Sequence, residues 1–152
     1  MKIRKALLSD APGIQKLINE FADKDLMLPR SLNHIYENIR DYYVAEEKGR
    51  MIGCAALHIV WGDLAEVNSL AVRDSHKGKG TGRALVSRCL DEARGLGIRR
   101  VFALTYVPKF FRKCGFSRIA KSKLPQKIWS DCLNCHKFPD CGEVSVAVDI
   151  DR

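Results

Sequence analysis

The stretch from Asn68 to Arg83, which reads NSLAVRDSHKGKGTGR, decides the fold that we predict for this chain. The segment Leu64–Val72, with its apolar alternation, predicts a strand that runs into this stretch. The segment Ala84–Leu96 follows it and has the amphipathic pattern of a long helix. A glycine-rich basic loop therefore joins a strand to the start of a helix.

This loop has the composition of an anion-binding site. Glycine recurs at positions 78, 80 and 82, and we expect these glycines in the first turn of the helix. Glycine has no side chain, so backbone N–H groups can approach an anion closely, and the helix N-terminus adds a partial positive charge. Basic side chains surround the same point. The residues expected to bind a diphosphate are Lys77, Gly78, Lys79, Gly80, Thr81, Gly82 and Arg83.

The spacing of the glycines distinguishes between kinds of phosphate site. It fits neither the Walker loop, G-x-x-x-x-G-K-[ST], nor the dinucleotide fingerprint, G-x-G-x-x-G. The run from Lys77 to Gly82 resembles the [Q/R]-x-x-G-x-[G/A] loop of the GNAT superfamily of N-acetyltransferases, with Lys77 in place of the usual Gln or Arg. The resemblance implies that this loop binds the pyrophosphate of acetyl-CoA. The alternative is a glycine-rich turn with solvated lysines.

The remaining pattern predicts one mixed α/β domain over residues 1–152. Strands are expected at Lys2–Ala6, Tyr42–Glu46, Met51–Trp61, Leu64–Val72, Arg100–Leu104 and Glu143–Asp149. Helices are expected after a cap at Ser9 or Asp10 with Pro12 in the first turn, from Ser31 to about Arg40, over Ala84–Leu96 and over Pro108–Lys113. The long helix should connect two neighbouring parallel strands. This order is also that of the GNAT fold, a central mixed sheet with a splay between adjacent parallel strands and with flanking helices.

Composition indicates which cellular compartment and which binding partners to expect. The net charge is +8, but the basic residues form no block, so a polyanionic cofactor and an acidic acceptor explain the charge without nucleic acid. The sequence has no apolar run of about 18 residues and no signal-peptide pattern, which argues against a membrane span. Six cysteines in such a chain predict reduced thiols in the cytoplasm. Three of them, Cys54, Cys89 and Cys114, lie in apolar patterns and are expected in the core.

A more specific resemblance lies in the last third of the chain. Leu104–Phe116 reads LTYVPKFFRKCGF, and Leu124–Glu143 reads LPQKIWSDCLNCHKFPDCGE. Together with MLPRS at Met27–Ser31, these segments are similar to the short, single-domain N-acetylglutamate synthases of bacterial arginine biosynthesis. The resemblance implies transfer of acetyl from acetyl-CoA to the α-amino group of L-glutamate, the first step of arginine biosynthesis.

The resemblance also implies roles for the strand that leads into the loop. Leu70, Ala71 and Val72 would meet the pantetheine arm of the cofactor where this strand splays from its neighbour. A backbone N–H near Leu70 would bind the oxyanion, a contribution of about 3 kcal/mol. Glu66 would deprotonate the ammonium directly or through a water; otherwise it is a carboxylate on the exposed or salt-bridged face of a strand.

The leaving thiolate has no evident proton donor in the sequence. The family's general acid is the tyrosine of YEKxGF, and the corresponding segment here is FRKCGF, with Phe111 at that position. Tyr106 is the nearest replacement, although it could instead pack under the short helix. A thiol with a pKa near about 8.5 could also leave with help from water alone.

The acceptor has two carboxylates, which a guanidinium binds well. Arg30, between the first two helices, is the first candidate, and Lys127 in LPQKIW is the second; either could be a solvated charge. The cluster Cys132, Cys135, His136 and Cys141 could hold a structural zinc ion, form a disulfide or remain as thiols, and no metal is required for the chemistry.

Other functions fit parts of the same pattern. An acetyltransferase for another amine or for a protein N-terminus would share the cofactor loop. A non-catalytic acetyl-CoA-binding regulator would account for Phe111. A homodimer is compatible with the sequence, whereas a nucleic-acid-binding module rests on charge alone.

Overall fold

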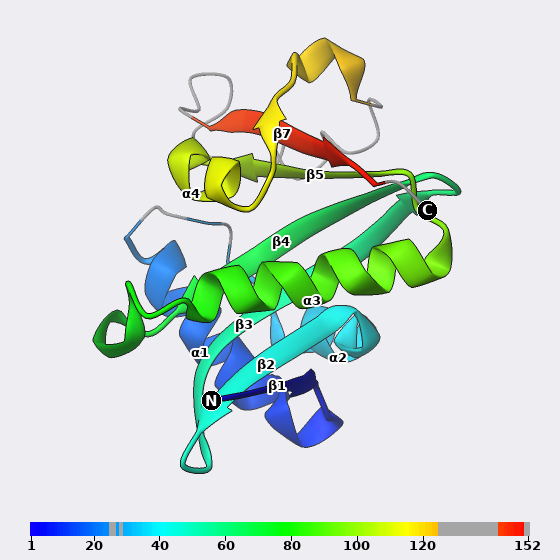
Figure 1. Ribbon diagram of the computed structural model, residues 1–152. Coiled ribbons are helices and arrows are strands. Elements are labelled where there is room, and N and C mark those ends of the chain that lie inside the picture. The colour runs from blue at the N-terminus through cyan, green and yellow to red at the C-terminus, as the bar shows by residue number, and fades with distance from the viewer. Residues whose placement is uncertain (25–26, 28, 125–142, 151–152) are drawn as a thin grey trace.

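The computed structural model describes residues 1–24, 27, 29–124 and 143–150, which contain one seven-stranded mixed sheet (Figure 1). Its strands, in chain order, are β1 Lys2–Lys5, β2 Tyr42–Glu47, β3 Arg50–Trp61, β4 Leu64–Val72, β5 Arg100–Thr105, β6 Ser117–Arg118 and β7 Val144–Asp149. They lie in the order β1-β2-β3-β4-β5-β7-β6. The β4 and β5 strands are parallel, and the other described neighbours are antiparallel. The fold is the mixed α/β sheet that the sequence predicted.

Helices cover both faces of this sheet. The α-helices are α1 Ala11–Ala22, α2 Leu32–Glu37, α3 Thr81–Leu96 and α4 Pro108–Lys113. Short 3-10 helices, among them η2 Ile39–Asp41 and η3 Asp74–His76, precede β2 and follow β4. In Figure 1, α3 crosses one face of the sheet, and α1 and α2 lie behind the other. The α3 helix thus connects two parallel neighbours, β4 and β5.

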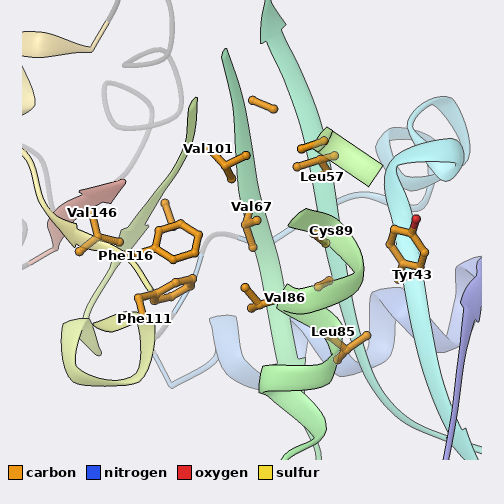
Figure 2. Close-up of a cluster of buried hydrophobic side chains, with 14 of the residues drawn as sticks. Tyr43, Leu57, Val67, Leu85, Val86, Cys89, Val101, Phe111, Phe116 and Val146 are labelled. Atoms are coloured by element: carbon orange, nitrogen blue, oxygen red, sulfur yellow. The ribbon is translucent and has the colours of Figure 1, made fainter. Parts of the chain in front are cut away.

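Alternation along the strands produces two large cores, one on each face of the sheet, and a smaller cluster of Leu64, Phe102 and Leu124. Side chains of α1, among them Ile14 and Ile18, are fully buried against Tyr42 and Ala56 of the sheet. The opposite face packs against α3, where burial raises the pKa of the Cys89 thiol to about 12. Figure 2 shows this second core, in which the rings of Phe111 and Phe116 lie side by side, 5.1 Å between centroids. Each face of the sheet therefore packs against a different set of helices.

Local sequence accounts for several boundaries. The Oγ of Ser31 accepts the backbone N–H of His34 at 3.1 Å, which confirms the predicted cap of α2. Lys48 and Gly49, with φ of 53° and 74°, form the two-residue turn between β2 and β3. Gly97 ends α3 with φ of 83°.

Some predicted details were wrong. Only Gly82 of the three loop glycines lies within α3, because the helix begins at Thr81 and Gly80 is its N-cap. Asp10 precedes α1 without capping it, since its carboxylate instead pairs with Arg4 at 2.8 Å. The second helix ends at Glu37 and not near Arg40.

The sequence also gave no sign of the two-residue strand β6, which pairs with β7 at the edge of the sheet. Cys54 and Cys89 are fully buried, as predicted, and Cys114 is partly buried against the same core as Cys89. In the described residues, no helix has the length and apolar character needed to cross a bilayer.

Candidate functional site

The sheet opens between its two parallel strands. In the described register, β4 pairs with β5 only from Leu64 to Glu66, opposite Arg100 to Phe102. Beyond Glu66, β4 continues to Val72 beside β3, while β5 continues to Thr105 beside β7. Figure 1 shows the two strands diverging in this direction. An extended ligand could therefore meet backbone groups of β4 that do not pair with β5.

A bulge in β4 lies inside this opening. Cys54 of β3 faces Ala71, and Ala56 faces Asn68, so two residues of β4, Ser69 and Leu70, stand opposite a single residue of β3 in the described register. Ser69 has a φ of 54°, a conformation that is uncommon for a residue other than glycine. The bulge redirects the backbone at the position where the sequence predicted an oxyanion-binding N–H.

The predicted diphosphate loop follows η3, the 3-10 helix after β4, and runs into the first turn of α3. Gly78 and Gly80 have φ of 76° and 84°, and a Cβ at either position would meet nothing within 4 Å. No described side chain caps the N-terminus of α3 at Gly80. The first N–H groups of this helix are therefore available to an anion, and Lys79 and Arg83 flank them in sequence.

The loop is held from two sides. Arg73 donates its backbone N–H to Ile52 and its Nε to Met51, both on β3. The imidazole of His76 contacts a carboxylate oxygen of Glu47 at 2.9 Å, which holds the pKa of that carboxyl below its ordinary value. These contacts hold the segment before the loop against the ends of β2 and β3 beside the turn that joins them.

On the other side, Lys77 reaches α1. Its Nζ lies 3.0 Å from Asp74, and it stands 4.9 Å from the centroid of the Phe21 ring. This ion pair lowers the pKa of Asp74. One of the predicted phosphate-binding cations thus already has an anionic neighbour, so the backbone N–H groups and the remaining basic residues carry more of the expected anion recognition.

Glu66 stands at the vertex of the opening, since it is the last residue of β4 that pairs with β5. Its carboxylate accepts the side-chain amide of Asn68 at 3.2 Å, so both side chains lie on one face of β4. That face is the α1 and α2 side, because Asn68 pairs with Ala56 of the core beneath α1. The position suits a base that acts inside the opening.

Arg30 lies beside α1. Its backbone N–H donates to Asn19 at 3.3 Å, and its carbonyl accepts from the side-chain amide of Gln15 at 3.4 Å. The positive charge of Arg30 acts on the buried Tyr42, whose pKa is raised chiefly by burial and is lowered in part by Ser69 and Arg30. Tyr42 in turn reaches Ser69 at the bulge, 3.4 Å between hydroxyl oxygens. The structure thus brings Arg30 toward the same face of the sheet as Glu66.

Tyr106 and Phe111 lie beyond the end of β5. Tyr106 is partly buried in the bend before α4. Phe111 is 4% exposed and forms edge contacts with both Phe110 and Phe116. A Cβ on Gly82 would lie 3.2 Å from the Phe110 ring, so α4 packs closely on the first turn of α3. Phe111 is therefore a core residue here.

The second acceptor candidate, Lys127, lies outside the described residues. So does the cluster Cys132, Cys135, His136 and Cys141. Within the described residues, no group of three or more His, Cys, Asp or Glu side chains is arranged to hold a metal ion.

Two pairs near the site were missed from the sequence. The imidazole of His58 contacts Asp41 at 2.7 Å, and His76 contacts Glu47 as described above. His58 and Asp41 are 17 residues apart along the chain, and His76 and Glu47 are 29 apart, so no local motif contains either pair. The pairing of β2 with β3 explains the contact between His58 and Asp41, whereas His76 reaches Glu47 from η3, the segment that follows β4.

Comparison with known proteins identifies a family and several relatives. Residues 9–116 match the acetyltransferase (GNAT) family. An uncharacterized N-acetyltransferase of Chlorobaculum tepidum is 41% identical over 95% of this chain and 93% of its own length. An amino-acid acetyltransferase of Mycobacterium tuberculosis is 36% identical over 85% of this chain and 75% of its own.

The fold is also similar to that of a larger solved enzyme. N-acetylglutamate synthase of Neisseria gonorrhoeae, complexed with coenzyme A and N-acetyl-glutamate, superimposes with a TM-score of 0.90 at 29% identity. The match covers 99% of this chain and 35% of that one, so the present chain corresponds to about a third of the longer enzyme.

Proposed function

This chain belongs to the GNAT family of acetyltransferases, and from that premise we propose that it transfers the acetyl group of acetyl-CoA to the α-amino group of L-glutamate. The observation that carries the proposal is the opening between β4 and β5 that leads straight into the uncapped N-terminus of α3. An elongated cofactor with a diphosphate at one end and a thioester at the other fits such a path.

The cofactor would bind along this path in two parts. Its diphosphate would meet the loop from Lys77 to Arg83, where glycine backbone and the start of α3 favour an anion. Its pantetheine arm would lie along Leu70, Ala71 and Val72, the half of β4 that leaves β5. The thioester would then come to rest near the bulge.

The reaction needs a neutral amine and a place for the oxyanion. Glu66 would take the proton of the ammonium, because it lies at the vertex of the opening on the α1 and α2 side. The backbone N–H near Leu70 would bind the oxyanion, because the bulge at Ser69 reorients the chain there. The new amide bond forms as the C–S bond of the thioester breaks.

The leaving thiolate takes up a proton from Tyr106 or from water. Phe111 has no hydroxyl, and its burial against Phe116 shows that it serves packing. Tyr106 lies in the segment between β5 and α4, near the diverging end of β5. A coenzyme thiolate is stable enough to leave unaided near neutral pH, so we expect the acid to matter less than the base.

Arg30 and the similarity to named relatives support an amino-acid acceptor. Arg30 is held by two side chains of α1 and acts electrostatically on Tyr42 beneath the bulge. A guanidinium there could bind a carboxylate of the acceptor while the amine faces Glu66. Lys127 would supply a second cation. Amino-acid acetyltransferase activity is the name given to the mycobacterial relative, which favours an amino acid as acceptor.

The direct test is release of free CoA from acetyl-CoA, with glutamate, glutamine, aspartate, simple amines and a short peptide as separate acceptors. We expect glutamate to give the largest kcat/KM. A larger value for another amino acid would change the acceptor, and reaction only with a peptide N-terminus would make the chain a protein acetyltransferase. Binding of acetyl-CoA with no turnover on any amine would instead indicate a regulator. A glutamate enzyme would act in the cytoplasm at the first step of arginine biosynthesis.

A further inference from the structure

An imidazole paired with a carboxylate lies beside Glu66, on the neighbouring strand and on the same face of the sheet. His58 of β3 and Glu66 of β4 face each other in the antiparallel register. Opposed residues of this kind share one face of the sheet and have Cβ atoms about 4.5–5.5 Å apart. The side chains of His58 and Glu66 are therefore immediate neighbours.

The imidazole is oriented from its other side. Nδ1 of His58 lies 2.7 Å from a carboxylate oxygen of Asp41, which ends η2 just before β2. An aspartate at this distance holds the ring in the tautomer with hydrogen on Nδ1 and stabilises the imidazolium form. The ring therefore exchanges protons through Nε2.

The three groups also form a path outward. Glu66 is partly buried at the vertex of the opening, whereas the side chain of His58 is 48% exposed. A proton that reaches Glu66 inside a cofactor-filled opening has to leave before the next turnover. The neighbouring imidazole is half in contact with solvent and can pass the proton on.

We propose that His58, oriented by Asp41, accepts the proton that Glu66 removes from the acceptor ammonium and releases it to solvent. This inference rests on the proposed function. The ammonium gives a proton to the Glu66 carboxylate, which becomes neutral; the proton then moves to Nε2 of His58, which becomes an imidazolium paired with Asp41. Loss of that proton to water restores the starting state, and no other reactant is needed.

Ordinary acidities favour this arrangement. A glutamic acid has a pKa of about 4.3, far below the value of about 8 for an α-ammonium group of a chain. A histidine, at about 6.5, lies between them and near neutral pH, where a proton acceptor works best. The transfer from the ammonium to Glu66 is therefore the unfavourable step, and the transfer that follows, from Glu66 to His58, is favourable, so His58 draws the proton away from Glu66.

Chemical rescue tests the relay. His58→Ala should lower kcat by between about 10- and 100-fold, at or below the lower end of the range for a general base, with the KM for acetyl-CoA unchanged. Imidazole in the buffer should restore much of the lost turnover, because the site of His58 is open to solvent. Pyrazole, a ring of the same size that is not basic at neutral pH, should restore none.

A matched control is His76→Ala, which removes a histidine paired with a carboxylate at 2.9 Å beside the cofactor loop. It should affect the KM for acetyl-CoA, and imidazole should not raise its kcat. Rescue of His58→Ala by both rings would assign His58 to packing. Unchanged kcat in His58→Ala, or a loss that imidazole does not repair, would overturn the relay.

Two safeguards keep the test decisive. If His58→Ala does not fold, His58→Gln keeps a side chain that can donate to Asp41 but takes up no proton, so its kcat should fall similarly and a normal kcat would overturn the relay. The wild-type protein is assayed first with the acceptor panel. Absence of acetyl transfer to any amine would remove the proposed function and the relay together, whereas normal transfer with an unaffected variant would remove the relay alone.

Discussion

Gly80→Val tests the assignment of the diphosphate loop. Gly80 is the N-cap of α3, has a φ of 84°, and has nothing within 4 Å of the place where a Cβ would lie. A valine side chain would therefore project into the open space in front of the first N–H groups of the helix. The proposed function puts the diphosphate of acetyl-CoA in that space.

The structure allows a rough magnitude. A hydrogen bond to a charged group contributes about 1.5–3 kcal/mol, and a branched side chain in front of the helix start would disturb one or two of them. A loss of about 3 kcal/mol corresponds to a rise of roughly 100-fold in the Kd for acetyl-CoA. Separately, the left-handed backbone would cost the folded protein about 1–2 kcal/mol with a residue other than glycine.

Gly49→Val separates these two effects. Gly49 has a φ of 74° and also has nothing within 4 Å of a Cβ, but it lies in the turn between β2 and β3. Both variants should lose a similar free energy of unfolding in urea titrations. Titration calorimetry with acetyl-CoA should show weakened binding for Gly80→Val alone.

A wild-type acetyl-CoA affinity in both folded variants would refute the reasoning. The loop would then be a glycine-rich turn with solvated lysines, and the diphosphate would have to bind elsewhere. Similar weakening in both variants would mean that strain, transmitted through the fold, and not obstruction of the anion, lowers the affinity.

Three further changes test other parts of the account. Arg30→Ala should raise the KM for glutamate at least about 30-fold, since truncating one side of a charge pair costs about 2–5 kcal/mol, and calorimetry should show unchanged acetyl-CoA affinity; unaltered glutamate kinetics would place the carboxylate pocket elsewhere. Glu66→Gln should lower kcat by about 10²–10⁴-fold and by more than Tyr106→Phe does, with cofactor binding retained; normal turnover at every pH would exclude Glu66 as the base. Asp10→Asn should destabilise the fold at pH 7, because the guanidinium beside Asp10 lowers the pKa of that carboxyl. The stabilisation by the ionised Asp10 carboxylate is fully present above the ordinary aspartate pKa of about 3.9. It is lost as the pH falls through the lower pKa that Asp10 has in the folded protein, so the urea midpoints of the variant and the wild type should converge in acid.

The fold could be read from the sequence where its signals are local. Alternation predicted Leu64–Val72 with the bounds that β4 has, and the pattern after Pro108 predicted α4 to its last residue. The parallel pairing of β4 with β5 followed from the helix between them. The cap at Ser31 followed from its hydroxyl.

The site could be predicted less completely, because its geometry depends on contacts between distant segments. The opening is set by where β4 stops pairing with β5, at Glu66, and the bulge places a serine at a φ of 54° that nothing in its sequence requires. His58 and Asp41 meet only because β2 and β3 pair as a hairpin. The roles of Glu66, Arg30, Tyr106 and Lys127, and of the residues assigned to the cofactor, remain predictions.

The central claim is that acetyl leaves the coenzyme and arrives on the α-nitrogen of glutamate. Nuclear magnetic resonance of α-¹⁵N-labelled glutamate, incubated with acetyl-CoA and the wild-type protein, observes that nitrogen directly. The account predicts conversion of the amine signal into an amide signal at the same rate as free CoA appears. Release of CoA with the labelled nitrogen still an amine, or no release at all, would contradict it.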